Sequence, residues 1–127
     1  MSLIQEISQH AEFVSEDTWL RDVAALMACS EAGVVGITRN GWPIGTITDH
    51  DLLKSAISLG RDLSKFRAKH VMELRPITIE WNSDSSDLID AAIVMRRNHA
   101  RNAIVMRGGI PVGIVSFSAL CKCDLTA

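Results

Sequence analysis

The sequence predicts an α/β fold made of two pseudo-symmetric repeats, each containing a strand, a helix, a hairpin and a second helix. Residues 4–54 and 72–122 superimpose at a constant offset of 68 residues without a gap. Glycines, prolines and helical residues coincide in both copies: Arg39/Arg107, Gly41/Gly109, Pro43/Pro111, Gly45/Gly113, Leu52/Leu120, Lys54/Lys122, Leu20/Leu88, Asp22/Asp90, Ala24/Ala92, Met27/Met95 and Ala32/Ala100. An internal repeat of this kind predicts two half-domains whose buried faces pack together.

The first repeat opens with a weakly extended segment at residues 9–13 and continues into a helix. Residues 15–18 supply the polar and acidic side chains that suit a helix start. The helix itself is predicted because four apolar residues recur at helical spacing and share one face. These residues are Leu20, Val23, Ala24 and Met27.

A β-hairpin is predicted next, from two short apolar runs at residues 33–38 and 43–48. Between them stands Asn40-Gly41, which is the strongest two-residue signal for a hairpin turn. Pro43 has no amide hydrogen to donate, so we expect it at the first position of its strand or on a sheet edge.

The end of the first repeat is predicted from a second helix and a polar connection. Residues 49–59 carry apolar residues on one helical face, and Gly60 is a typical helix terminator. The polar, basic segment 61–69 is the expected linker. We therefore divide the chain into repeat 1 at residues 1–60, this linker, and repeat 2 at residues 70–123.

The second repeat is predicted to contain the same elements in the same order. Its helix carries an apolar stripe, and Gly108-Gly109 supplies its hairpin turn. The expected elements are an extended segment at 76–79, a helix around 88–95, strands at 102–106 and 111–116, and a last helix at 117–122. The strand order does not follow from the periodicity.

Composition favours a small cytoplasmic protein with a well-formed core. The chain has 127 residues, a hydrophobic share of 47% and a formal net charge of -2. This balance argues against nucleic-acid binding despite a local arginine cluster in the second half. No apolar run approaches the roughly 18 residues that a membrane span needs, and no signal peptide is visible. The three cysteines form no disulfide framework, which fits a reducing compartment.

Enzymatic and metal chemistry find little support in the sequence. Cys121 and Cys123 lack a second pair of ligands nearby, so a metal site there is not expected. Consecutive residues on a helix point in different directions, so Asp49, His50 and Asp51 do not converge on one ion. No nucleophile elbow, phosphate-binding loop or dinucleotide motif is present. We therefore expect a protein that is not an enzyme and requires no cofactor.

The hairpin motif resembles that of the CBS domain, which occurs in tandem as a Bateman module. The pattern Gly-x-Pro-x-Gly-x-x-Thr-x-x-Asp-Leu stands at residues 41–52, and residues 109–120 repeat its first half. Val71-Met72 also matches the start of a repeat in this family. The resemblance covers nearly the whole chain. It implies a cleft between the repeats that binds an adenosyl ligand such as AMP, ADP, ATP or S-adenosylmethionine.

The resemblance places the ribose of this ligand at Asp51, with Thr48 beside it. A single carboxylate can accept hydrogen bonds from both hydroxyls of a ribose. Thr48-x-x-Asp51 also has the form of a capping box, in which the two residues satisfy the helix start reciprocally. The two roles are compatible, and both stay open at this point.

The remaining site residues follow from the resemblance as well. Arginine is the usual fork for a phosphate, and Arg101 precedes the first hairpin strand of the second repeat. The apolar walls around the base and the rest of the expected ligand set are His50, Ile47, Thr46, Ile77, Thr78 and Ile79. Each of the strand residues is equally typical of a protein core.

The second repeat carries Ser116 and Ala119 where the first has Thr48 and Asp51. Serine can still cap a helix, but alanine cannot accept a hydrogen bond from a ribose. We therefore expect one competent site. The resemblance further implies a homodimer that regulates an unidentified protein in trans. The alternative is an interaction scaffold that dimerises without a ligand.

Overall fold

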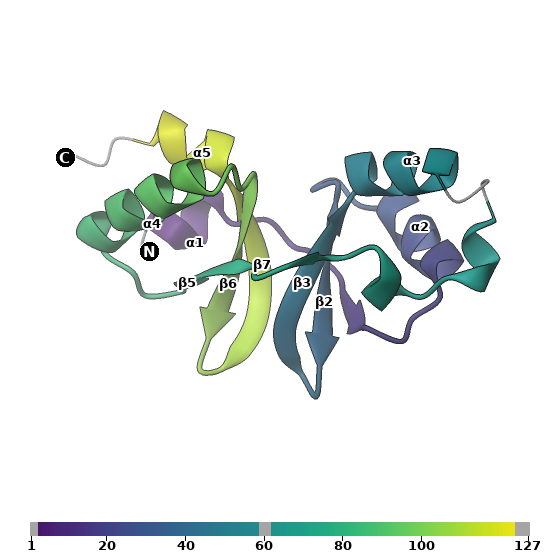
Figure 1. Cartoon of the computed structure of the whole chain (residues 1–127). Coiled ribbons are helices and arrows are strands. Elements are labelled where there is room, and N and C mark those ends of the chain that lie inside the picture. The colour runs from purple at the N-terminus through teal and green to yellow at the C-terminus, as the bar shows by residue number, and fades with distance from the viewer. Residues whose placement is uncertain (1–2, 59–61, 124–127) are drawn as a thin grey trace. The chain divides into compact units, whose positions relative to one another are not determined.

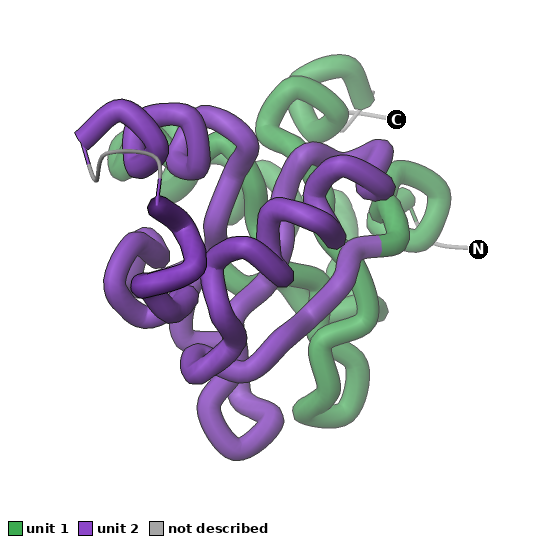
Figure 2. The backbone as a smooth tube through the Cα atoms, turned by 90° about the vertical axis from the view of Figure 1, so that its right-hand side faces the viewer, with its two compact units in different colours: residues 1–10, 77–127 green, residues 11–76 purple. Residues whose placement is uncertain are grey.

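The two sequence repeats form two compact units, and each unit also takes up a segment from outside its repeat. The computed structural model describes residues 3–58 and 62–123. Unit 2 contains residues 11–76, and unit 1 contains residues 1–10 together with 77–127. Figure 2 colours the two units separately. Gly60 and Arg61, expected at the helix end and the linker start, lie outside the described residues.

Unit 2 is a four-stranded sheet with helices (Figure 1). Its elements are β1 (Phe13–Ser15), α2 (Leu20–Ala28), β2 (Val34–Arg39), β3 (Trp42–Thr48), α3 (Asp49–Ser58), the 3-10 helices η1 (Leu63–Lys65) and η2 (Ala68–His70), and β4 (Glu73–Leu74). The strand order is β1-β2-β3-β4. Strand β1 pairs with β2 in parallel, and the other pairs are antiparallel. The predicted hairpin and both helices are confirmed.

Unit 1 has the same plan with three strands. Its elements are α1 (Leu3–Ile7), β5 (Ile77–Glu80), α4 (Ser85–Arg97), β6 (Asn102–Arg107), β7 (Ile110–Ser116) and α5 (Phe117–Lys122). The strand order is β5-β6-β7, with β5 parallel to β6 and β6 antiparallel to β7. The α/β fold predicted from the repeat is therefore confirmed in both units.

Both hairpins turn as their sequences predict. Asn40 and Gly41 have φ values of 52° and 80°, and Gly108 and Gly109 have 57° and 80°. Two successive positive φ angles define the type I′ turn, whose twist matches that of the strands. The two hairpins also share an irregularity in strand pairing. The register shifts after Ile37 in one hairpin and after Val105, the matching residue, in the other.

Each core combines the predicted helical stripe and strands with side chains from outside them, namely Ile4 of α1, Ala68 of η2 and Leu120 of α5. In unit 2 the buried cluster is Leu20, Val23, Met27, Val35, Ile37, Ile47 and Ala68. In unit 1 it is Ile4, Ile79, Leu88, Met95, Ala103, Val105, Val115 and Leu120. Burial of each large apolar side chain in these clusters contributes about 1.5–3 kcal/mol. The two clusters share no residue, so each unit has a core of its own.

The segment expected as a linker is packed on unit 2 from Asp62 onward. Ala68 is fully buried, and Phe66 packs against the core. The backbone amide of Leu20 donates to the Phe66 carbonyl at 2.8 Å, and the amide of Ala68 donates to the Thr18 carbonyl at 2.8 Å. The units defined by contacts and the repeats defined by sequence thus divide the chain differently.

These backbone bonds also correct the expected start of α2. Residues 15–18 were expected to cap the helix, but Trp19 occupies the N-cap position and its side chain makes no capping bond. Ser15 Oγ instead accepts from the amide of Asp17 at 3.1 Å. The amide of Leu20 is satisfied by a carbonyl from the segment after Asp62, which local sequence patterns do not reveal.

Two acids next to β1 bind distant parts of unit 2. Arg39 Nη2 donates to Glu16 Oε1 at 2.9 Å, and Lys69 Nζ donates to Asp17 Oδ1 at 2.9 Å. The hydrogen bond from Arg39 lowers the pKa of Glu16 below its ordinary value of 4.5. The hydrogen bond from Lys69 lowers the pKa of Asp17 below 3.8 in the same way.

Folding stability is therefore expected to decrease in acid partly because of Glu16. A pKa that is lower in the folded state means that the charged acid stabilises the fold above the unfolded pKa. This contribution is lost as the pH falls through the folded pKa. Urea titrations between about pH 6 and pH 3 should show a weaker loss of stability in Glu16→Gln than in the original chain. The exposed Glu31→Gln is the matched control, and equal pH dependence in all three proteins would contradict the prediction.

Candidate ligand-binding site

The junction of β3 and α3 is a reciprocal capping box. The amide of Asp51 donates to Thr48 Oγ1 at 3.1 Å, and the amide of Thr48 donates to Asp51 Oδ2 at 2.9 Å. The capping role of these two residues is thus realised. Among the described residues, the second carboxylate oxygen, Asp51 Oδ1, has no hydrogen-bond partner. One oxygen of the half-buried acid is therefore left to bind a ligand.

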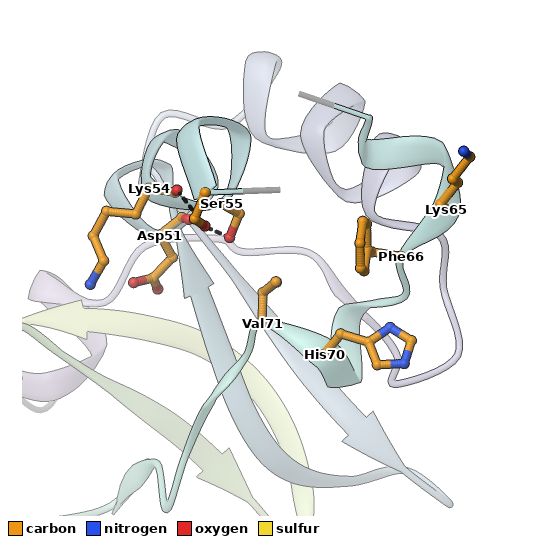
Figure 3. Close-up of a pocket in the computed structure, with 8 residues that line it drawn as sticks. Asp51, Lys54, Ser55, Lys65, Phe66, His70 and Val71 are labelled. Atoms are coloured by element: carbon orange, nitrogen blue, oxygen red, sulfur yellow. Dashed lines mark hydrogen bonds between the residues drawn. The ribbon is translucent and has the colours of Figure 1, made fainter. Parts of the chain in front are cut away.

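Asp51 also lines a pocket that lies entirely within unit 2 (Figure 3). The cavity volume is about 570 Å³, which falls in the range of roughly 300–1,000 Å³ that small-molecule sites occupy. One wall is a face of α3, and the other is formed by residues 65–71, from the last residue of η1 onward. The lining residues are Asp51, Lys54, Ser55, Ser58, Lys65, Phe66, His70 and Val71.

The helical wall offers two hydroxyl acceptors and the ammonium group of Lys54. Ser55 Oγ donates to the Asp51 carbonyl at 2.8 Å, and Ser58 Oγ donates to the Lys54 carbonyl at 3.0 Å. Because each hydroxyl has a single proton, both face the pocket as acceptors. Lys54 forms no ion pair within residues 3–58 and 62–123.

The opposite wall is held in place by its own polar contacts. Lys65 Nζ lies 3.4 Å from Asp62 Oδ2, and the hydrogen bond from the Ser64 hydroxyl lowers the pKa of Asp62 below its ordinary value of 3.8. The amide of Arg67 donates to His70 Nδ1 at 2.8 Å. Nδ1 of the His70 ring is therefore the acceptor that fixes this ring relative to Arg67.

The expected site residues of the first repeat all lie in unit 2, around the end of β3. Thr46 and Thr48 are half-buried and His50 is exposed, whereas Ile47 is fully buried in the core. Of this set only Asp51 lines the pocket. The side chain of Ile47 supports the core, which is the role that its strand position allowed equally well.

The expected residues of the second repeat lie in unit 1. Ile77, Thr78 and Ile79 belong to β5, where Ile79 is buried in the core and Thr78 is exposed. Arg101 is exposed at the bend before β6, and its carbonyl accepts from the amide of Phe117 at 2.8 Å. The structure thus places the two halves of the expected set in different units.

Most of the pocket residues were missed by the sequence analysis. Lys54, Ser55 and Ser58 follow Asp51 at helical spacing, so they share its face of α3, and this periodicity would have found them. Phe66 and His70 carry no such signal. They reach the pocket because the segment after Asp62 folds back onto unit 2, which depends on long-range contacts.

The second repeat keeps half of the capping arrangement. Ser116 Oγ accepts from the amide of Ala119 at 3.0 Å, which confirms that this serine caps α5. Ala119 has no carboxylate to return the bond to Ser116. The acid that stands in the pocket of unit 2 therefore has no counterpart at this helix start.

The part of the chain that the structure describes contains neither a metal-binding cluster nor a membrane-spanning helix. Within it, no group of three or more His, Cys, Asp or Glu residues is placed to hold a metal ion. None of its helices has the length and apolar character of a membrane-spanning segment.

Comparison with solved structures identifies the fold. A CBS domain protein from Pyrobaculum aerophilum, solved as a complex with AMP, is 22% identical with a TM-score of 0.76, covering 98% of this chain and 93% of its own. A CBS-domain protein from Agrobacterium tumefaciens is 21% identical with a TM-score of 0.72, covering 94% of this chain and 88% of its own. No protein-family model and no curated protein matches the sequence.

A third structure is the CBS domain of a bacterial CNNM/CorC-family Mg²⁺ transporter in complex with ATP. It is 20% identical with a TM-score of 0.73, and the alignment covers 95% of this chain and 85% of its own. The chain therefore has the fold of a tandem CBS domain pair, or Bateman module. The repeated hairpin motif predicted this fold.

Proposed function

We propose that the chain is a regulatory module that binds an adenine nucleotide or a related adenosyl ligand. The observation that carries the proposal is Asp51, which lines a pocket and has one carboxylate oxygen that receives no hydrogen bond from residues 3–58 and 62–123. Two structures with the same fold were solved with AMP and with ATP. These complexes support an adenine nucleotide as the ligand.

In this proposal the free oxygen of Asp51 accepts from the ribose hydroxyls. Hydrogen bonds to a charged acceptor contribute about 1.5–3 kcal/mol each, so one acid is enough to orient the sugar. Thr48 fixes the carboxylate by binding its other oxygen. Arg101, His50, Thr46, Ile77 and Thr78 keep the ligand contacts that the family resemblance implies.

The proposal is tested by thermal unfolding with AMP, ADP, ATP and S-adenosylmethionine, one at a time. A ligand at 100 times its dissociation constant adds about 2.7 kcal/mol to the free energy of unfolding. We expect at least one of the four to raise the unfolding temperature. If none does at millimolar concentration, the chain is not an adenosyl sensor.

Ala119→Asp is expected to create a second competent site. Ser116 already caps α5 as Thr48 caps α3, so an acid at position 119 would complete the box and present a free oxygen. Isothermal titration should then give two ligands per chain, compared with one in the original protein. A stoichiometry that remains at one would show that the acid alone does not distinguish the two helix starts.

The remaining part of the proposal is that the chain forms a homodimer and that this homodimer regulates a separate effector protein. Two helices carry exposed apolar pairs four residues apart, Leu53 and Ile57 on α3 and Ile89 and Ile93 on α4. Side chains at this spacing share one helical face, and such faces are typical of contact surfaces. An effector protein must bind the liganded and empty states with different affinity.

These apolar faces also favour the second candidate function, a scaffold that dimerises without a ligand. Light scattering distinguishes the two functions. Leu53→Glu combined with Ile57→Lys should convert a dimer to a monomer, and a dimer that ignores all four adenosyl compounds would support the scaffold.

A further inference from the structure

Residues 66–72, called the strap, fasten one wall of the pocket to the rest of unit 2. Two backbone hydrogen bonds of 2.8 Å join the strap to residues 18–20, and the amide of Lys69 donates to the Glu16 carbonyl at 3.0 Å. The chain then runs through β4 to Pro76, where unit 2 ends and unit 1 begins. The strap is therefore both a wall of the pocket and the start of the connection between the units.

His70 closes a turn of backbone within the strap. The amide of Arg67 donates to His70 Nδ1 at 2.8 Å, and the amide of His70 donates to the Arg67 carbonyl at 3.0 Å. The Arg67 side chain binds the connection before α2: its guanidinium carbon lies 3.9 Å from the centre of the Trp19 ring, and its Nη1 donates to the Asp17 carbonyl at 2.6 Å. The His70 ring thus holds the backbone of the residue that makes these contacts.

The hydrogen bond to His70 exists only while Nδ1 carries no proton. An imidazole nitrogen can accept a hydrogen bond in the neutral ring, whereas both nitrogens are donors in the charged ring. A protonated ring would turn an N–H group toward the N–H group of Arg67, so this bond would be lost. Histidine is the side chain whose charge ordinarily changes between pH 5 and 8. The strap therefore contains a contact that mild acid removes.

The charged groups around His70 come from α3, from η1, from the strap itself and from the connection before α2. They are Asp51, Lys54, Lys65, Arg67, Lys69, Glu16 and Asp17. Carboxyl, lysine and arginine side chains ordinarily titrate outside the range of histidine. Hydrogen bonds from Arg39 and Lys69 lower the pKa of Glu16 below 4.5 and that of Asp17 below 3.8. A change of the strap in mild acid is therefore assigned to the His70 ring.

We propose that His70 is a pH-sensitive latch, which holds the strap against unit 2 when the ring is neutral and loosens it when the ring is protonated. A contact that needs the neutral ring stabilises the strap at high pH, and its contribution is lost as the pH falls. Segments beside binding pockets commonly open locally without global unfolding. Loosening of the strap changes one wall of the pocket and the start of the connection to unit 1. The inference goes beyond the proposed function, because the latch acts without a ligand.

Amide hydrogen exchange in the ligand-free protein tests the latch. Protection factors remove the direct effect of pH on the exchange rate, so they report local opening. Loss of a cap of this kind corresponds to a roughly 2- to 30-fold change in the opening equilibrium. We expect the protection factors of the Ala68 and Lys69 amides to fall by this amount between about pH 7.5 and about pH 5.5, while those of β6 in unit 1 stay constant. Unchanged protection of the strap would overturn the proposal.

Variants at position 70 separate the latch from other effects of acid. His70→Gln supplies an oxygen that can accept from the Arg67 amide and does not titrate, so its strap should stay protected at both pH values. His70→Ala should show the weaker protection at both. His99→Asn is the matched control, because it removes an exposed histidine of unit 1 at a positive φ that asparagine tolerates. A full pH response in His70→Gln would show that another group loosens the strap and would overturn the proposal.

An NMR titration of the unaltered protein covers the case in which the variants fail to fold. The chain contains four histidines, so each ring can be followed separately. The amide signal of Arg67 should shift with the same midpoint as the His70 ring, because the two groups share one hydrogen bond. An Arg67 amide signal that stays constant while the His70 ring gains its proton would overturn the inference and leave the proposed function standing.

Discussion

Asp51→Asn is expected to remove most of the stabilisation by nucleotide and to leave the fold nearly as stable as before. The amide side chain keeps an oxygen that can accept from the Thr48 amide, so the capping box survives in part. The charged acceptor for the ribose is lost. Hydrogen bonds to charged groups are worth about 1.5–3 kcal/mol, so the dissociation constant should rise roughly 10- to 150-fold.

Asp51→Ala separates the two roles of this acid. It removes both the cap and the ribose acceptor, so it should lower the free energy of unfolding by about 1 kcal/mol in addition to the loss of binding. Urea unfolding without ligand measures the first effect and calorimetry measures the second. A chain with Asp51→Asn that binds nucleotide as well as the original would exclude Asp51 from the site.

Gly45→Ala is expected to destabilise the fold strongly, because Gly45 is buried in β3 between β2 and β4. A Cβ atom at Gly45 would lie 2.8 Å from the carbonyl oxygen of Glu73, which belongs to β4. Because the obstacle is backbone, β4 must move away from β3. Overpacking of this kind costs about 1–3 kcal/mol.

The matching residue of the second repeat provides an independent copy of this test. A Cβ atom at Gly113 would lie 2.8 Å from the Gln9 carbonyl oxygen, so Gly113→Ala should cost a similar amount. Gly41→Asn is the control, because this turn position has open space around it and asparagine tolerates its positive φ. If Gly41→Asn unfolds at a lower urea concentration than both Gly45→Ala and Gly113→Ala, the explanation by close backbone contacts is wrong.

The two glycines illustrate what the repeat pattern can and cannot predict. Their recurrence at the same hairpin position was visible in the sequence, but its cause was not. At each glycine a segment from outside the repeat approaches the strand, residues 73–74 at one and Gln9 at the other. Such pairings join residues far apart in the chain, and no local period reports them.

The same distinction applies to the helices and turns. The hairpin turns depend on two adjacent residues that tolerate positive φ, and the helices depend on apolar residues at helical spacing, so both could be predicted locally. The start of α2 could not, because the Leu20 amide is satisfied by the Phe66 carbonyl from the far end of unit 2. Local capping residues were available but were not used.

The candidate site was predictable only as far as its motif extends. Thr48 and Asp51 stand in the motif itself, and the cap leaves room for the proposed ligand role because it uses only one of the two carboxylate oxygens. Phe66 and His70 could not be predicted as site residues, because their position, like the start of α2, depends on contacts between segments distant in the sequence. They line the pocket only after the segment following Asp62 has folded back against the start of α2.

The most direct test of the central claim compares two ligands and two proteins by calorimetry. The ligands are the tightest-binding nucleotide and its 2′,3′-dideoxy analogue, and the proteins are the original chain and Asp51→Asn. If Asp51 binds the ribose, the original chain should prefer the complete sugar by roughly 10- to 150-fold, and Asp51→Asn should lose most of this preference. An undiminished preference in Asp51→Asn would show that another group reads the sugar and would contradict the account.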